Sequence, residues 1–242
     1  MENSLWLHRI LNSLDMISEN LKIVESRMDG ALKAAGRNAG EARLVAVSKT
    51  FPASCVQEAY DAGQRAFGEN RVQELMEKTP QLPKDIEWHL IGHLQHNKVR
   101  HAVEHASWIH SIDSLALLKR VVSIAGELGR APKLLLEVNI SGEESKFGLR
   151  REEVIPVLQQ CPTPLCCGLM TVAPFEATPD ELHRIFASLR EAKDEAAKAT
   201  GLALTELSMG MSGDFEIAIA EGATMVRVGS AIFGHRDYGA AG

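Results

Sequence analysis

Short apolar runs alternate with longer amphipathic stretches along most of the chain. The runs are rich in β-branched residues and lack clean alternation, which is typical of parallel strands covered by helices. A first helix is expected from about Leu5 to Ala35. The runs that follow predict eight strands: Leu44–Ser48, Arg65–Phe67, Glu87–Ile91, Trp108–Ile112, Lys133–Asn139, Leu165–Thr171, Glu206–Ser208 and Met225–Val228.

Helical patterns separate these strands, and most are long enough for a crossover between parallel neighbours. They include Ser54–Ala62, Ser114–Leu128, Arg151–Gln160, Asp180–Thr200 and Asp214–Glu221. Strands and helices in this order predict an α/β fold, a single (β/α)8 TIM-like barrel with an extra N-terminal helix. A doubly wound open sheet is the alternative. Because no linker divides the chain, we expect one domain over residues 1–242, with residues 1–40 packing on the barrel.

Composition excludes several classes of protein. The 242 residues are 45% hydrophobic and 24% charged, the proportions of an ordinary globular chain. The net charge of -6 argues against a nucleic-acid partner, which would need a concentrated basic excess. No run of about 18 apolar residues is present, so no membrane span is expected. We expect a monomer.

The four cysteines indicate the cellular compartment in which the protein is expected. None of them forms a CxxC pair of the kind used in zinc or redox sites. We expect reduced and mostly buried thiols and a cytoplasmic protein, with a redox role for the vicinal pair Cys166 and Cys167 as the alternative.

Lys49 closes the first predicted strand and is the first candidate for chemistry. In a barrel the working residues gather where strands end. Taken alone, Lys49 resembles an ordinary strand-end lysine that reaches solvent. Beside apolar walls, however, a lysine amine becomes nucleophilic enough to form an imine with an aldehyde.

Two turns near the other end of the chain suit an anion. The first, in LSMGMSGDFEIAIAEG, runs from Gly210 to Ser212 and opens a helix with Asp214 beside it. It would present N–H groups, a hydroxyl and a helix dipole to a phosphate, although Ser212 or Asp214 would equally serve as a helix cap. The second is Gly229 and Ser230, after the eighth strand. The loops after strands seven and eight are the common phosphate site of barrel enzymes.

Arg227 lies within the apolar run MVRVG and should face the barrel interior. A buried guanidinium needs a partner. The structural interpretation is an ion pair with an acidic residue inside the barrel. The functional interpretation is a donor to a ring nitrogen or to a phosphate.

Polar side chains in the middle of the sequence are expected near the barrel mouth. The segments FGENRVQEL and WHLIGHLQHNK both end strands, and LEVNISGEESKFG ends another. No metal site is expected, because His93 and His96 lack a third ligand at a recognisable interval. The candidates for the mouth are Asn70, His89, His93, Gln95, Asn97, Lys98, Glu137, Asn139, Lys146 and Gly148.

The motifs AVSKTFP, FGENRVQEL, WHLIGHLQHNK, EVNISGEESKFG, GLM, LSMGMSGDFEIAI and VRVGSAIFG resemble those of the pyridoxal phosphate homeostasis proteins, the YggS/PROSC family. The resemblance extends from about Leu44 to Tyr238. It implies a barrel like the N-terminal domain of alanine racemase, a fold-type III protein that binds pyridoxal 5′-phosphate (PLP).

The same resemblance implies the roles of individual residues. Lys49 would hold PLP as an internal aldimine, and Asn70 would pack near the ring. Arg227 would face the pyridine nitrogen, so the cofactor would be a weak electron sink. The phosphate would be held by Ser212, Gly229 and Ser230. Members of the family are associated with vitamin B6 and amino-acid homeostasis.

Three functions stay open at this point. The first is a protein that stores, buffers or delivers PLP to apo-enzymes without robust catalysis. It is favoured because the tyrosines, Tyr60 and Tyr238, are not at strand ends, so a second base is missing. The second is a weak PLP-dependent racemase or lyase with His93 or another mouth residue as base. The third is a Schiff-base aldolase in which Lys49 attacks a sugar ketone.

Overall fold

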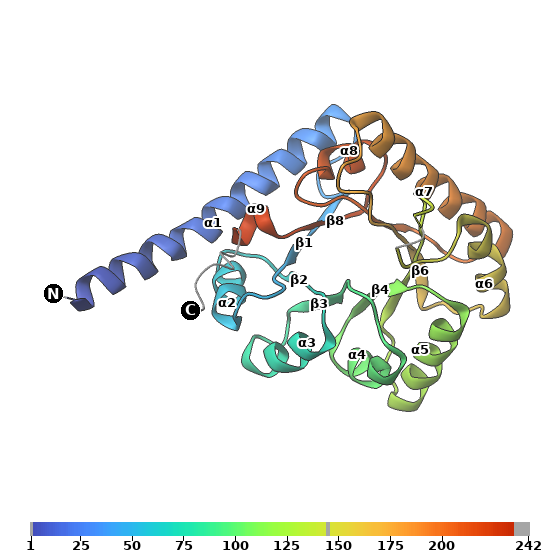
Figure 1. Cartoon of the computed structure of the whole chain (residues 1–242), viewed down its shortest axis with the longest axis horizontal. Coiled ribbons are helices and arrows are strands. Elements are labelled where there is room, and N and C mark those ends of the chain that lie inside the picture. Colours follow the sequence, from blue (N-terminus) through green and yellow to red (C-terminus); the bar gives the residue numbers. More distant parts are fainter. Residues whose placement is uncertain (1, 144–145, 235–242) are drawn as a thin grey trace.

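A computed structural model describes residues 2–143 and 146–234, with side chains described from Met16 onward. Eight parallel strands form a closed barrel in sequence order (Figure 1). The first strand pairs with the second and with the eighth, which closes the ring. The strands are β1 (Arg43–Val47), β2 (Ala66–Glu69), β3 (Glu87–Leu90), β4 (Trp108–Ile112), β5 (Lys133–Glu137), β6 (Cys166–Met170), β7 (Glu206–Ser208) and β8 (Met225–Val228).

Helices follow the strands and form the outer layer of the barrel. The α-helices are α1 (Glu2–Ala34), α2 (Ala53–Asp61), α3 (Val72–Lys78), α4 (Val99–His105), α5 (Leu115–Leu128), α6 (Val154–Gln160), α7 (Pro179–Thr200), α8 (Phe215–Ala220) and α9 (Ser230–Phe233). Short 3-10 helices are η1 (Thr79–Gln81), η2 (His96–Lys98) and η3 (Arg151–Glu153).

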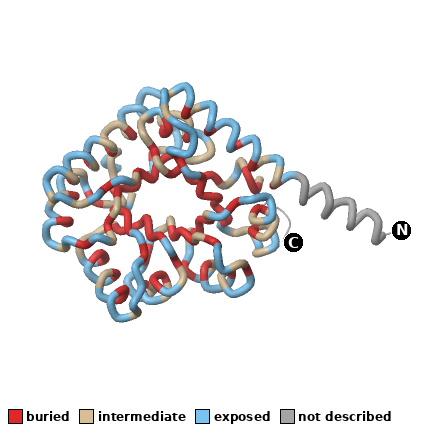
Figure 2. Tube along the Cα trace, turned by 180° about the vertical axis from the view of Figure 1, so that it is seen from behind, coloured by how far each residue is buried: buried red, intermediate tan, exposed pale blue. Residues whose placement is uncertain are grey.

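Two apolar clusters divide the core. The larger one lies between the strands and the helices, and Figure 2 shows the trace of the inner ring of strands as largely buried. The smaller one fills the barrel interior, because its members share a strand face with the inward side chain of Arg227. It consists of Val45, Trp108, Leu135, Met170 and Met225.

Helix α1 packs against α2, α8 and α9 and so covers the seam between the first and last strands. Asn20 Nδ2 donates to the carbonyl of Ile232 in α9 at 2.9 Å. Arg37, just beyond α1, donates to the carbonyls of Ile219 and Ala223 at 2.8 and 2.9 Å. These bonds tie the beginning of the chain to its last barrel unit.

The predicted fold class is confirmed, and so is each predicted strand, with bounds that differ by two residues or fewer. The exact match at Trp108–Ile112, Glu206–Ser208 and Met225–Val228 reflects apolar runs bounded by polar or turn residues. Helix α9 was not predicted, because four residues are too few to establish a helical period. Among the described residues, no helix is long and apolar enough to cross a membrane.

Candidate functional site

Barrel closure brings the ends of β1 and β8 to one cavity of about 760 Å³. Its walls include all six residues expected to bind a cofactor: Lys49, Asn70, Ser212, Arg227, Gly229 and Ser230. Apolar side chains complete it: Val47, Ile91, Val172, Pro174, Phe175, Ala177, Leu182 and Met211. An amine, a guanidinium and two glycine turns therefore surround one space.

Lys49 is exposed, and a tight turn directly after β1 positions it. The next residue, Thr50, has φ 67°, a left-handed conformation that is unfavourable for a β-branched side chain. Its N–H donates to Glu74 Oε2 at 2.7 Å, and the N–H of Phe51 donates to the carbonyl of Ser48 at 3.1 Å. The strained conformation is thus held by a hydrogen bond to the Glu74 carboxylate of α3.

A buried ion pair supports this turn from behind. Lys78 Nζ lies 2.6 Å from Glu69 Oε1 and donates to the carbonyl of Ser48 at 2.9 Å. Ser48 Oγ donates to the same Glu69 oxygen at 2.7 Å. Burial raises the pKa of Glu69 to about 7, against the opposing effect of the Lys78 ammonium. We call Ser48, Glu69, Glu74 and Lys78 the turn support.

The first anion-suited turn lies between β7 and α8. Gly210 has φ 94°, and a Cβ there would lie 2.6 Å from Ala218 Cβ, so the position requires glycine. Asp214 Oδ1 accepts from the N–H of Met211 at 2.5 Å and closes the turn, without capping α8 by its side chain. The N–H groups of Ser212 and Gly213 donate no hydrogen bond within the described part of the chain, so they are free for a ligand.

The second anion-suited turn leads from β8 into α9. A Cβ on Gly229 would lie 3.1 Å from the carbonyl oxygen of Val47, so a side chain there would require the end of β1 to shift by a few tenths of an ångström. The N–H of Ser230, at the start of α9, has no acceptor among the described residues. The rings of Phe51 and Phe233 pack 5.4 Å apart and hold α9 against the Lys49 turn.

Arg227 is buried in the wall of the cavity, and of its two interpretations the ion pair with an acidic residue is not seen among the described residues. Its Nη1 donates to Ser208 Oγ at 2.7 Å, and its Nη2 donates to the carbonyl of Thr171 at 2.8 Å. Burial lowers the pKa of Arg227 to about 10, which leaves the guanidinium charged at neutral pH. Neutral oxygens rather than a carboxylate therefore hold this cation.

A second hollow of about 420 Å³ adjoins the first and shares Asn70 with it. A Cβ on Gly92 would lie 2.4 Å from the carbonyl oxygen of Asn70, so this glycine lets the loop after β3 approach Asn70. The hollow is also lined by the predicted mouth residues His93, Gln95 and Lys98.

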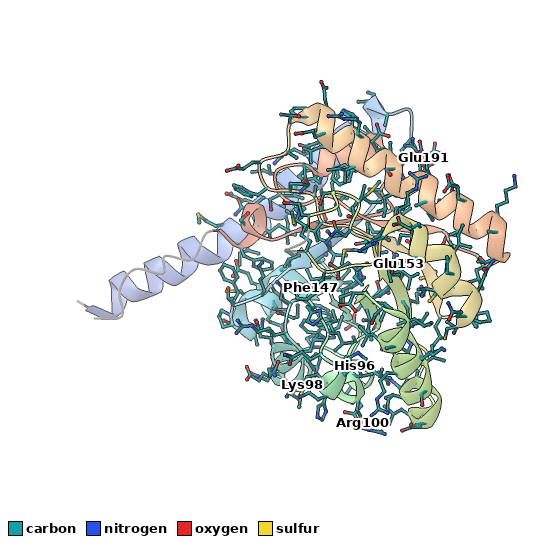
Figure 3. The ribbon with its side chains drawn as sticks, turned by 45° about the vertical axis from the view of Figure 1, so that its right-hand side comes forward. His96, Lys98, Arg100, Phe147, Glu153 and Glu191 are labelled. Atoms are coloured by element: carbon teal, nitrogen blue, oxygen red, sulfur yellow. The ribbon has the colours of Figure 1, made fainter. Side chains whose placement is uncertain are left out.

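The neighbouring basic side chains continue along η2 and α4 (Figure 3), where His96, Lys98 and Arg100 lie close together. Asn97 is exposed in η2 and lines neither hollow. Its prediction as a mouth residue is therefore wrong.

Most of the chain matches one family model, the N-terminal domain of alanine racemase, which aligns with residues 13–237. The pyridoxal phosphate homeostasis protein of Pseudomonas aeruginosa is 44% identical over 94% of this chain and 99% of its own length. The chain belongs to the pyridoxal phosphate homeostasis family. The human family member is 41% identical over 90% of this chain and 86% of its own length.

Solved structures agree with this family assignment. PipY of Synechococcus elongatus PCC7942, solved with PLP bound, is 45% identical, with a TM-score of 0.80 over 90% of this chain and all of that one. Alanine racemase from Corynebacterium glutamicum is 20% identical with a TM-score of 0.71, covering 94% of this chain and 63% of the racemase. At that identity the likeness to alanine racemase concerns the barrel fold alone.

Two ionisable residues predicted near the barrel mouth, His93 and Glu137, lie in different surroundings. His93 Nδ1 lies 3.1 Å from Asp113 Oδ2, and its ring stacks on exposed Phe147 at 4.0 Å. Glu137, the last residue of β5, is partly buried, and the charges of Asp113 and Arg227 act on it. Burial raises the pKa of Glu137 to about 7.

The loop after β5 is held by its own polar groups. Asn139 Oδ1 accepts from the N–H of Gly142 at 3.0 Å, and the ammonium of Lys146 pairs with Glu143. Gly148 has φ 117° and lies too close to the backbone of Asn139 for a side chain. These predicted candidates shape the loop and do not line the main cavity.

A polar chain that the sequence did not reveal runs through the barrel interior. His89 was predicted at the mouth, and the structure places it buried among the inner strand faces. His89 Nε2 lies 3.0 Å from Glu87 Oε1, and His89 Nδ1 lies 2.9 Å from His110 Nε2. His110 Nδ1 lies 2.8 Å from Ser208 Oγ. We call Glu87, His89, His110 and Ser208 the inner chain; it ends on Arg227.

The cysteines are structural. None of the four cysteines, all within the described residues, forms a disulfide, and burial raises the pKa of Cys166 to about 12 and that of Cys167 to about 11. A thiol must ionise to react, so such values disfavour redox chemistry by this vicinal pair. In the described part of the chain, no three His, Cys, Asp or Glu side chains lie close enough to hold a metal.

Proposed function

We propose that the protein binds PLP in the main cavity as an imine on Lys49 and acts in intracellular PLP homeostasis. The observation that carries this proposal is the enclosure of one 760 Å³ cavity by an amine, a buried guanidinium and two turns with free N–H groups. The relatives named for PLP homeostasis and the PLP-bound PipY structure support it.

The chain's own residues fit the parts of the cofactor. We propose that Ser212, Gly229 and Ser230 bind the phosphate, because glycine turns with free N–H groups bind anions well. Lys49 would lie at the aldehyde and Asn70 against the ring. When bound, PLP supplies an aldehyde for amines and an electron-withdrawing ring.

Arg227 would set the electronic state of that ring. A guanidinium with a pKa of about 10 donates hydrogen bonds and keeps its protons at neutral pH. The ring nitrogen facing it would therefore accept a hydrogen bond and stay unprotonated. This arrangement favours retention of the cofactor over carbanion chemistry, which supports a role in storage or delivery to PLP-dependent apo-enzymes.

The test is the absorption spectrum of the purified protein with PLP, followed by borohydride reduction and peptide mass analysis. We expect a chromophore that reduction fixes on Lys49 and that disappears in Lys49→Ala. The matched control is Lys98→Ala, because Lys98 lines the neighbouring hollow and not the main cavity. An unchanged spectrum in Lys49→Ala would overturn the proposal.

A weak PLP-dependent racemase or lyase is the second candidate. It is favoured by Glu137, whose pKa is raised to about 7 by burial, and by the His93–Asp113 pair at the mouth. Against it, Tyr60 in α2 donates a hydrogen bond to Asp85 and does not line the cavity, and Tyr238 lies outside the described residues. Exchange of amino-acid α-protons in deuterated water, faster than with free PLP, would establish this activity.

We further propose that the protein is a cytoplasmic monomer of one domain. The absence of a disulfide at the four cysteines, all of them described, supports a reducing compartment. Sedimentation at increasing concentration tests the monomer, and a mass that rises toward a dimer would contradict it. Transfer to a partner is tested by activation of an apo-enzyme with the PLP-loaded protein in the presence of a trap for free PLP.

A further inference from the structure

The inner chain crosses the barrel from one end to the other. It begins at Glu87, the first residue of β3, whose side chain is 36% exposed. It passes through three residues with no exposed surface, His89, His110 and Ser208. It ends on Arg227 in the wall of the cavity. Consecutive donor–acceptor distances are 3.0, 2.9, 2.8 and 2.7 Å.

With both imidazoles neutral, the carboxylate end of the inner chain fixes the direction of every hydrogen bond in it. A guanidinium only donates, so Ser208 Oγ accepts from Arg227, and the Ser208 hydroxyl keeps its hydrogen to donate to His110 Nδ1. At the other end, the hydrogen bond from His89 lowers the pKa of Glu87 to about 2, so this carboxylate only accepts. His89 must then carry its proton on Nε2, and so must His110.

This arrangement is complete only while both imidazoles are neutral. A second proton on His89 would place its N–H against the N–H of His110, and a second proton on His110 would turn the Ser208 hydroxyl from a donor into an acceptor. Burial lowers the pKa of His89 and of His110, in agreement with neutral rings. Trp108 stacks on His89 at 5.5 Å and keeps the ring in place.

The charged groups around the inner chain lie at its ends. Arg43 and Lys133 lie over the Trp108 ring, at 5.0 and 4.6 Å from its centroid. Arg43 also pairs with Glu87 at 3.5 Å and with Glu206 at 3.3 Å. At the cavity end the chain meets the Arg227 guanidinium, on which the charges of Asp214 and Glu137 act.

We propose that Glu87, His89 and His110 are positioning residues that act on the cofactor through Ser208 and Arg227. Hydrogen bonds that all point one way polarise one another, so the Glu87 carboxylate makes Ser208 Oγ a stronger acceptor for the guanidinium. The ring nitrogen of the cofactor is thus coupled to a carboxylate at the opposite end of the barrel. The coupling rests on the proposed function, because it takes Arg227 as the partner of that nitrogen.

The tautomers are tested first, in the protein without PLP, by long-range nitrogen–proton NMR of labelled histidines assigned with His89→Gln and His110→Leu. We expect both rings to be neutral, with the proton on Nε2 and Nδ1 bare. A proton on Nδ1 of either ring would reverse the chain and overturn the proposal. This measurement judges the inner chain even if the protein does not bind PLP.

The coupling is tested next in the PLP-loaded protein with Glu87→Gln, which keeps an acceptor oxygen and removes the charge. The matched control is Glu206→Gln, because Glu206 pairs with the same Arg43 and lies outside the inner chain. We expect Glu87→Gln to shift the absorption maximum of bound PLP and to release PLP about fivefold faster, with Glu206→Gln unchanged. Equal behaviour of the two variants would overturn the proposal.

Failure of the proposed function gives a different result. In that case the wild-type protein shows no chromophore, or Lys49→Ala leaves it unchanged, while the tautomers of the apo-protein are unaffected. His110→Leu provides a further measurement, since cutting the chain should release PLP about tenfold faster. If His110→Leu does not fold, the wild-type tautomers and the two glutamine variants still decide the question.

Discussion

The cavity has two cationic side chains, and the protein supports them by opposite means. The turn that bears Lys49 rests on a buried ion pair between Glu69 and Lys78, outside the barrel wall. Arg227 rests on neutral groups inside the barrel, reached through Ser208. A buried ion pair is destabilised when one of its charged partners is removed. A chain of neutral hydrogen-bonding groups is destabilised when one of them gains a proton.

The largest effect is expected from breaking the turn support with Lys78→Met. The Glu69 carboxyl would be left buried without its cation, and we expect the free energy of unfolding to fall by about 3 kcal/mol in urea denaturation. Arg100→Met is the control, because it removes an exposed pair with Glu127 and should cost less than about 1 kcal/mol. Equal costs would mean that the turn support does not stabilise the fold.

Breaking the inner chain with His110→Leu should cost somewhat less, about 2 kcal/mol, because no charge is left unpaired but Ser208 and His89 each lose a partner. The same denaturation measurement applies. His183→Leu removes an exposed histidine paired with Glu221 and serves as control. A cost below that of the control would show that the chain contributes nothing to stability.

The dependence of stability on pH should separate the two supports. The pKa of Glu69 is raised to about 7 from its usual 4.5, so its contribution to the unfolding free energy decreases as pH rises through this range. The pKa values of His89 and His110 are lowered from 6.5, so their contribution is fully present above pH 6.5 and decreases as pH falls below it.

The unfolding free energy of wild type minus that of a variant, plotted against pH, measures these opposite signs. For Glu69→Gln this difference should have a slope of up to about -1.4 kcal/mol per pH unit below neutrality. Subtracting His110→Leu should give a positive slope over acidic pH. Two slopes of the same sign would contradict the assignment of charged and neutral supports. Glu137, whose pKa is also raised, cancels in both differences.

The smallest effect is expected at Thr50, which has φ 67°. Thr50→Gly should raise the free energy of unfolding by about 0.5 kcal/mol, because the relief of backbone strain exceeds the added chain entropy. Thr205→Gly, in an exposed segment without positive φ, should lower it by a similar amount. Destabilisation by both substitutions would mean that the Thr50 turn is not strained.

The sequence was sufficient for the barrel and for the gathering of the six cavity residues, because strand ends and glycine turns are local patterns. It did not reveal the turn support behind Lys49 or the inner chain behind Arg227. Glu69 and Lys78 meet only because β2 and α3 pack together. His89 was expected at the mouth, since alternation indicates which face a side chain occupies and not its depth in the barrel. The roles of the cavity residues toward PLP stay predictions.

The contact of Phe51 with Phe233 has a consequence for synthesis of the protein. Lys49 leaves the ribosome long before Ser230 and α9. Until β8 has emerged, β1 has no eighth strand to pair with, and the two anion-suited turns are incomplete. A nascent chain therefore presents Lys49 without the rest of the cavity, and under the proposed function cofactor capture would require that the ring of strands has closed.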